Sequence, residues 1–439
     1  MSECVGQLRH VCSLGGMQTV VSIERAVPIL HAGPGCMAKI SGAVSQFNGS
    51  RGAGYQGGEQ IPCTNLMESD VIFGGEEKLR SVIRNAHKIM DADIFVVLTS
   101  CIPEIVGDDV ARVTKDFRDE KVATVYAETG GFNGTNYVGH EIVVDALIDQ
   151  YLKPAAKKQP GLVNVWSVVP YQDPCWSGNY NELERLLTEI GLIPNIIFGY
   201  NRGLAALDRV PQAEFNLLVS PWTGLRNVKK LEEKFNTPFL HYPALPIGPT
   251  ETGRFLRTVG SFAGLPQDHI EAVIEKHERE YYHYFETTLE VIYETRVLPN
   301  HFLTVADSFY ALGIARFFIN DMGMIPETQF VTDGVLPEYQ NLVREEFRQF
   351  NYNLIPELVF SNDGSHVQEE IRKMKFKSRP LIIGSAWERE LANEVGGYQA
   401  SISMPVWERL IMKRFYVGYD GALNLLEDVY TSILSKLRG

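Results

Sequence analysis

The sequence alternates between short apolar runs and longer stretches in which apolar residues recur every three or four positions. The short runs have the length of buried β-strands, and the longer stretches predict amphipathic helices. Such alternation is typical of parallel sheets that helices cover on both faces. We therefore expect an α/β protein with three Rossmann-like doubly wound domains and mostly parallel sheets.

Three domains also suit the length of 439 residues, at about 150 residues for each domain. A Lys- and Pro-rich linker at residues 153–161 and a long helical stretch at residues 269–296 separate the units. We predict domains at residues 1–155, 156–297 and 298–439, the first of which binds a cluster. The predicted strands are residues 26–31, 71–73, 94–99 and 122–127, then 162–169, 195–200, 215–220 and 238–242, then 301–306, 329–332, 358–361 and 380–384.

Composition excludes several classes of protein. The net charge is −13, and no run of five or more Lys or Arg occurs, so a nucleic-acid partner is not expected. No apolar stretch reaches ~18 residues, so no membrane span is expected, and the first residues do not resemble a secretion signal. We expect a cytoplasmic protein, in which six cysteines are free, metal-bound or catalytic rather than disulfide-linked.

Three cysteines carry the strongest chemical signal, because Cys12, Cys36 and Cys101 each lie in a turn that contains Gly or Pro. Cys36 and Cys101 each follow a predicted strand and precede a predicted helix. A helix dipole and free N–H groups stabilise a thiolate at such a position, and thiolates bind iron or zinc. Carboxyl ends of parallel strands share one edge of a sheet, so the sequence predicts one shared metal site.

Other groups carry weaker signals. The chain has no Cys-x-x-Cys pair, so zinc is a weaker interpretation than an iron–sulfur cluster with distant ligands. The glycine-rich segment 49–58 lacks the Gly-Lys-Ser/Thr ending of a phosphate-binding loop, and the acidic pair after Gly107 is more typical of a solvated loop than of a magnesium site. Weak candidates for metal ligation are Cys4, Cys63, Cys175, His10, His31, His87 and His140.

Four motifs in order resemble the catalytic component of nitrogenase and its relatives. They are VCSLGG at residues 11–16, HAGPGC at 31–36, VIFGG at 71–75 and TSCIPEIVGDD at 99–109. The resemblance extends over nearly the whole chain, because segments 245–252, 384–385 and 418–422 are similar to landmarks of the β subunit.

This resemblance implies specific roles. Each α and β subunit of that family supplies three cysteines to an eight-iron P-cluster at their interface, which would make Cys12, Cys36 and Cys101 the ligands here. The α subunit holds the FeMo-co-like cofactor, and this chain lacks a cysteine between residues 195 and 245. We therefore expect an electron-relaying β-type subunit of an α2β2 complex, with no substrate site of its own. The ATP-dependent iron–sulfur reductase would dock at Phe73, Gly107, Asp108 and Asp109.

Three departures from molybdenum nitrogenase point to a nitrogenase-like branch. Few residues precede Cys12, residues 52–65 form an unusual insert, and the segment Gly130–Gly131 has glycine where nitrogenase β subunits have a serine that ligates the oxidised cluster. The methylthio-alkane reductases, which cleave C–S bonds, are the preferred match. A true nitrogenase β subunit, a cofactor-assembly scaffold subunit and a protochlorophyllide-type reductase with a simpler cluster stay open, as does a plain small-molecule-binding protein.

Overall fold

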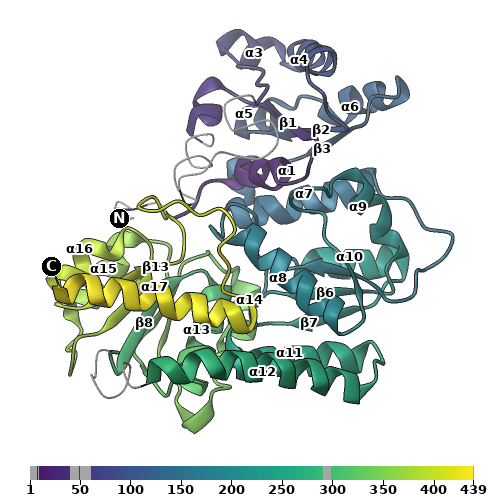
Figure 1. The fold of residues 1–439 in the computed structure, drawn as a ribbon. Helices are drawn as coiled ribbons and strands as arrows, with labels where there is room; N and C mark the ends of the chain where they lie inside the picture. The colour runs from purple at the N-terminus through teal and green to yellow at the C-terminus, as the bar shows by residue number, and fades with distance from the viewer. Residues whose placement is uncertain (1–6, 8, 40–48, 50–60, 290–297, 439) are drawn as a thin grey trace.

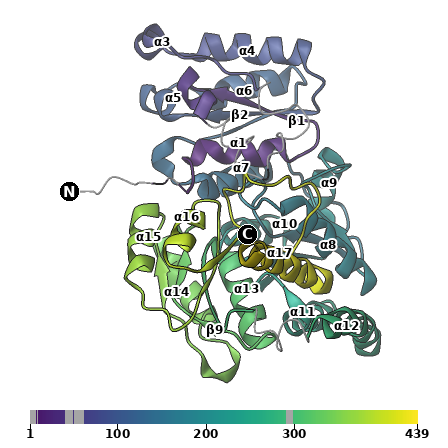
Figure 2. The ribbon, with the colours of Figure 1, turned by 60° about the vertical axis from the view of Figure 1, so that its left-hand side comes forward.

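The computed structural model describes residues 7, 9–39, 49, 61–289 and 298–438. They form three α/β units, each with its own parallel sheet (Figure 1). The unit of the N-terminal sheet lies at the top of Figure 1, the second at the right and the third at the lower left. A rotated view shows the first unit stacked on the other two (Figure 2). The expected fold class, α/β with Rossmann-like units and mostly parallel sheets, is confirmed.

The first sheet has the order β1-β2-β3, and every pairing is parallel. Alternate residues of its strands point to opposite faces. Val27 and Ile29 pack with the apolar sides of α4 and α6, while Ala26 and Leu30 face the main core of α1 and α7. The elements of this unit are η1 (Ser13–Gly16), α1 (Met17–Val21), β1 (Ala26–His31), α3 (Glu68–Phe73), α4 (Glu76–Ile89), β2 (Ile94–Thr99), α5 (Cys101–Val106), α6 (Val110–Asp119), β3 (Thr124–Ala127), η2 (Gly131–Asn133) and α7 (Asn136–Gln150).

The second sheet has the order β5-β4-β6-β7 and is parallel throughout. Its last helix, α12, packs with α11 and the C-terminal helix α17 at the bottom of Figure 1. The elements are β4 (Leu162–Trp166), α8 (Trp176–Glu189), β5 (Ile193–Asn195), α9 (Leu204–Arg209), η3 (Val210–Gln212), β6 (Phe215–Val219), α10 (Leu225–Phe235), β7 (Phe239–Tyr242), α11 (Gly248–Phe262) and α12 (Gln267–Leu289).

The third sheet has the order β11-β10-β8-β12-β13, and β9 pairs with β8 outside this path. The elements are β8 (His301–Ala306), α13 (Ser308–Asn320), β9 (Ile325–Pro326), β10 (Gln329–Val331), α14 (Pro337–Glu346), η5 (Asn351–Asn353), β11 (Leu358–Phe360), α15 (Gly364–Lys373), β12 (Leu381–Gly384), α16 (Glu388–Glu394), β13 (Tyr398–Ser401) and α17 (Gly418–Arg438).

Buried polar groups join the three units at their centre. Tyr137 of α7 donates a hydrogen bond to Asp307, which follows β8. Trp222, which follows β6, donates its Nε1–H to Asp333 over 2.9 Å. These four side chains are at most 5% exposed, so large aromatic rings and carboxylates fill the junction.

Two predicted strands are wrong. Residues 71–73 end the helix α3, and their apolar side chains are exposed rather than buried in a sheet. The segment 195–200 contains only the last residue of β5, because its chain turns at Gly199, whose φ is 110°. Ile196 and Phe198 are nevertheless buried, so hydrophobicity there serves the core without strand pairing. Among the described helices, none is long and apolar enough to cross a membrane.

Candidate metal centre

The first sheet brings two of the predicted cysteine ligands to one edge. His31 and Thr99 are the last residues of β1 and β2, and they are register partners. The chain continues from these strand ends to Cys36, five residues after His31, and to Cys101, two residues after Thr99. Parallel register therefore places both cysteines beyond the same edge.

Each candidate cysteine lies at the start of a helix. Cys12 is the N-cap of η1, Cys36 lies in the first turn of the helical residues 34–39, and Cys101 is the first residue of α5. Pro103 occupies the first turn of α5, where its missing N–H costs no hydrogen bond. Cys12 is exposed, and Cys36 and Cys101 are partly buried.

The turn at Gly131 connects Cys101 with Cys12. Gly131 donates its N–H to Cys101 Sγ over 3.0 Å. A Cβ atom on Gly131 would lie 3.1 Å from Cys101 Sγ and 3.3 Å from Cys12 Cβ. The two cysteines therefore face the same glycine, and this contact brings Cys12 to the edge that carries Cys101.

Glu104 and Ser13 hold this turn, although the motif analysis assigned no role to either. Glu104 Oε1 accepts hydrogen bonds from the Gly130 N–H over 2.7 Å and from the Thr99 hydroxyl over 2.5 Å. The Ser13 hydroxyl lies 2.9 Å from the carbonyl oxygen of Thr129. The only signal of Glu104 in the sequence is its place three residues after Cys101, on the same side of a helix.

The electrostatics of Cys36 differ from the expectation of a thiolate stabilised by a helix dipole. Burial raises the pKa of the Cys36 thiol, and the nearby thiols of Cys12, Cys101 and Cys63 raise it further. Burial and mutual repulsion thus outweigh the short helix at Cys36. A thiolate at this position requires a positive charge beside it, such as a bound metal.

The three thiols are better suited to supply half of the ligands of a larger cluster than to enclose one metal ion. Among the described residues, no group of three or more Cys, His, Asp or Glu side chains is arranged to hold a single metal ion. Three thiols at one edge and a backbone N–H aimed at sulfur suit an iron–sulfur cluster. Among the described residues, Cys12 is exposed rather than enclosed by this chain.

The weaker cysteine candidates lie in different surroundings. Cys63 sits beside β1, where its Sγ approaches the Ala32 carbonyl at 3.5 Å, and burial raises its pKa. Cys175 is buried at the start of α8 in the second unit. Cys4 lies outside the described residues.

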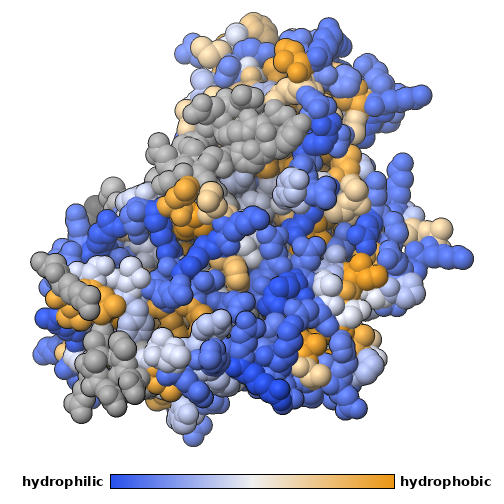
Figure 3. Space-filling view, viewed as in Figure 1, coloured by the Kyte–Doolittle hydropathy of each residue, from blue (hydrophilic) through white to orange (hydrophobic). Residues whose placement is uncertain are grey.

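The predicted docking residues lie on one side of the first unit but differ in exposure. Phe73 at the end of α3 is 85% exposed, and Ile72, Ile105 and Phe132 are also largely exposed. The Asp109 side chain is 53% exposed, whereas that of Asp108 is only 4% exposed. We call the exposed side chains of Met67, Val71, Ile72, Phe73 and Ile105 the apolar patch. Figure 3 shows apolar groups amid hydrophilic surface at the end of the molecule that carries α3.

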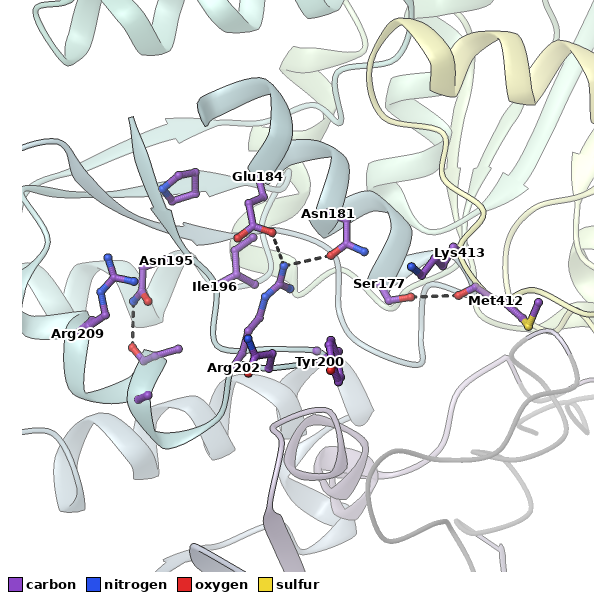
Figure 4. Close-up of a pocket in the computed structure, with 15 residues that line it drawn as sticks. Ser177, Asn181, Glu184, Asn195, Ile196, Tyr200, Arg202, Arg209, Met412 and Lys413 are labelled. Carbon is purple, nitrogen blue, oxygen red and sulfur yellow. Dashed lines mark hydrogen bonds and ion pairs between the residues drawn. The ribbon is translucent and has the colours of Figure 1, made fainter. Parts of the chain in front are cut away.

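A cavity of about 580 Å³ lies apart from the cysteines, between α8, α9 and the segment at Met412 (Figure 4). Arg202 extends toward Glu184 and Asn181 in this view, with Nη2 lying 2.7 Å from the carboxylate and 3.1 Å from the amide oxygen. The guanidinium charge is thus paired within the protein. No cysteine is among the described lining residues, so the cavity is not part of the metal centre.

Comparison with known structures defines the class of fold first. A solved structure titled "Nitrogenase Cp1 at pH 6.5" aligns with a TM-score of 0.82 over 100% of this chain and 95% of that chain, at 17% identity. The chain has the nitrogenase-type arrangement of three α/β units. A family model described as "Nitrogenase component 1 type Oxidoreductase" matches residues 12–434, and the chain therefore belongs to this oxidoreductase family.

Curated relatives cover most of the chain at low identity. The nitrogenase molybdenum-iron protein beta chain of Methanococcus maripaludis is 24% identical, over 96% of this chain and 93% of the relative. The beta chain from Klebsiella pneumoniae is 22% identical, over 97% and 82%. An alpha chain, from Bradyrhizobium diazoefficiens, is 25% identical over 91% and 83%.

Proposed function

We propose that this chain is the β-type subunit of a nitrogenase-like reductase. In this proposal Cys12, Cys36 and Cys101 supply half of the ligands of a P-cluster-type iron–sulfur cluster, and a homologous α subunit supplies the rest. The observation that carries the proposal is that Cys12 and Cys101 lie against Gly131, whose N–H is donated to Cys101 Sγ, and that both thiols are near enough to Cys36 to raise its pKa. Relatives with beta-chain and alpha-chain names support the pairing of two related subunits.

The role of the chain is to hold and tune the cluster, which supplies one-electron transfer when bound. Gly131 donates a hydrogen bond to sulfur, which favours the more negative charge state of a ligand. The buried strands β1 and β2 keep the cysteine loops in register and exclude water beneath them. The ATP-dependent reductase would bind the apolar patch together with Gly107 and Asp109.

Substrate chemistry would belong to the α partner. The centre of this chain, where its three units meet, is filled by Tyr137, Tyr310 and Trp222, each at most 2% exposed. No cysteine lies between residues 195 and 245 to hold a cofactor there. Glycine in the segment Gly130–Gly131 and the insert at 52–65 favour the branch that cleaves C–S bonds of methylthio-alkanes over dinitrogen reduction.

The decisive test uses the anaerobically purified complex of the chain with its partner and its reductase. We expect the iron and acid-labile sulfide of an eight-iron cluster in addition to those of the cofactor on the α subunit, and sulfide cleavage when dimethyl sulfide is supplied. Four fewer iron atoms per heterodimer would indicate a four-iron cluster. Ammonia formation from dinitrogen at a comparable rate would instead assign the chain to a true nitrogenase, and bound iron without any turnover would assign it to a scaffold.

A further inference from the structure

His31 and Asp108 form a buried pair behind the candidate metal centre. His31 Nε2 lies 2.9 Å from Asp108 Oδ2, and the two side chains are 0% and 4% exposed. Burial lowers the pKa of His31 while Asp108 opposes that effect, so the imidazole is neutral and donates its Nε2–H to the carboxylate. Its Nδ1 then accepts the Thr64 hydroxyl, which lies 3.2 Å away.

The same carboxylate also holds the turn between α3 and α4. Gly75 N lies 2.9 Å from Asp108 Oδ1 and 3.1 Å from Oδ2. A Cβ atom on Gly75 would lie 2.8 Å from Asp108 Oδ2 and 2.9 Å from His31 Cε1, so only glycine fits there. The pair, the turn and Thr64 therefore pack against one another, and we call them the His31 cluster.

Three residues of the His31 cluster lie within seven positions of a candidate cysteine ligand or of the apolar patch. His31 precedes Cys36 by five residues, and Asp108 follows Cys101 by seven residues across the single short helix α5. Gly75 follows Phe73, the most exposed side chain of the apolar patch, by two residues. One buried pair thus contacts both cysteine-bearing segments and the segment that carries the apolar patch.

The charged side chains around the pair already form ion pairs with one another. The charges of Asp70 on α3 and Glu76 on α4 raise the pKa of His31 and so oppose the effect of burial. Lys78 Nζ lies 2.7 Å from Asp70, and Arg112 pairs with Glu76. Asp108 consequently depends on His31 and the Gly75 N–H for its hydrogen bonds. Loss of either hydrogen bond disturbs the whole His31 cluster.

We propose that His31 and Asp108 are positioning residues that fix the apolar patch and the cysteine loops in one geometry, so that binding at the patch is transmitted to Cys36 and Cys101. This inference rests on the proposed function, since it takes the patch as the docking surface and the cysteines as cluster ligands. Asp108 acts from inside the protein, in contrast with the exposed Asp109 beside it.

The variant Asp108→Asn tests this inference in the purified complex. Its amide has one acceptor oxygen, so its NH₂ group would face either the His31 Nε2–H or the Gly75 N–H. In the first case His31 must change tautomer, and the direction of its hydrogen bond with Thr64 reverses. We expect unchanged iron content, about tenfold weaker binding of the reductase and a shifted midpoint potential of the cluster. Amide hydrogen exchange should become faster in both segments, 32–39 and 62–75. The control Asp116→Asn removes an ion pair to Arg80 on the other side of α4 and should change none of these.

The outcomes are distinguishable. Weaker reductase binding with parental potential and parental exchange in segment 32–39 would overturn the inference, because Asp108 would then act at the surface only. If Asp108→Asn loses iron, amide hydrogen exchange is compared between the iron-free variant and the iron-free parent complex. Faster exchange in only one of the segments 32–39 and 62–75 would then overturn the inference. An iron-free parental complex would instead refute the proposed function. The variant His31→Gln, whose amide can still donate to Asp108, should lie closer to the parent in all measurements.

Discussion

Gly131 is the first residue of η2, and its N–H is donated over 3.0 Å to Sγ of Cys101, the first residue of α5. The glycine is held there by Glu104, which accepts the neighbouring Gly130 N–H. The absence of a side chain at 131 lets Cys12 and Cys101 approach the same backbone. A substitution at this one position therefore acts on two candidate ligands at once.

We predict that Gly131→Ala lowers the iron content of the complex or shifts the potential of its cluster. The new methyl group would lie 3.1 Å from Cys101 Sγ and 3.3 Å from Cys12 Cβ, which is tighter than ordinary contact. Iron analysis and a redox titration of the complex measure both effects. Gly33→Ala is the matched control, because its Cβ would lie 3.6 Å from the nearest atom, an ordinary contact. Parental iron and potential in Gly131→Ala would contradict the placement of these ligands.

Two of the three candidate cysteine ligands can be tested against the fourth nearby thiol. We expect Cys36→Ala and Cys101→Ala to lower bound iron and abolish turnover, because a cluster cannot replace a lost thiolate with a methyl group. Cys63→Ala should retain iron, since the Cys63 thiol interacts with the Ala32 carbonyl and the Asn65 N–H instead. Full iron in both ligand variants, or iron loss in Cys63→Ala alone, would reverse the assignment.

The sequence predicted the strands at this site well, because β1 and β2 are continuous apolar runs that end at His31 and Thr99. It could not predict the contact of Gly131 with Cys101, which joins residues 30 positions apart through the packing of η2 against the start of α5. The short apolar run at residues 71–73 misled the strand prediction, because three residues are too few to distinguish a buried strand from an exposed helix. The burial of Asp108 could not be predicted either, because its partner His31 is 77 residues away in the sequence.

We predict that Phe73→Ala weakens binding of the reductase without changing the thermal stability of the complex. The Phe73 side chain is 85% exposed, so its removal leaves no cavity. If Phe73 is a hot spot of the interface, its truncation costs about 2 kcal/mol or more of binding free energy. Affinity measurement with the purified reductase, together with a thermal melt, checks both parts. Ile89→Ala, at the far end of α4 and 82% exposed, is the control and should bind the reductase like the parent.

The buried carboxyl of Asp307 predicts how stability depends on pH. Burial, together with the charge of the neighbouring Asp333, raises its pKa to about 8. Between pH ~4 and ~8 the folded protein therefore holds a proton on Asp307 that the unfolded chain has released. Folding takes up that proton, so the stabilising contribution is present at low pH and is lost as pH rises toward 8.

We expect Asp307→Asn to flatten this dependence. For one such group the free energy of unfolding falls by about 1.4 kcal/mol per pH unit across the window, and an amide has no proton to release. Denaturant unfolding of the parent and the variant from pH 5 to pH 8 measures the difference in slope. Asp116→Asn, which removes a partly exposed carboxyl, should keep the slope of the parent. Equal slopes in the parent and Asp307→Asn would mean that Asp307 is ionised inside the folded protein, and that its hydrogen bonds with Tyr137 and Ser403 hold a charge at the junction of the three units.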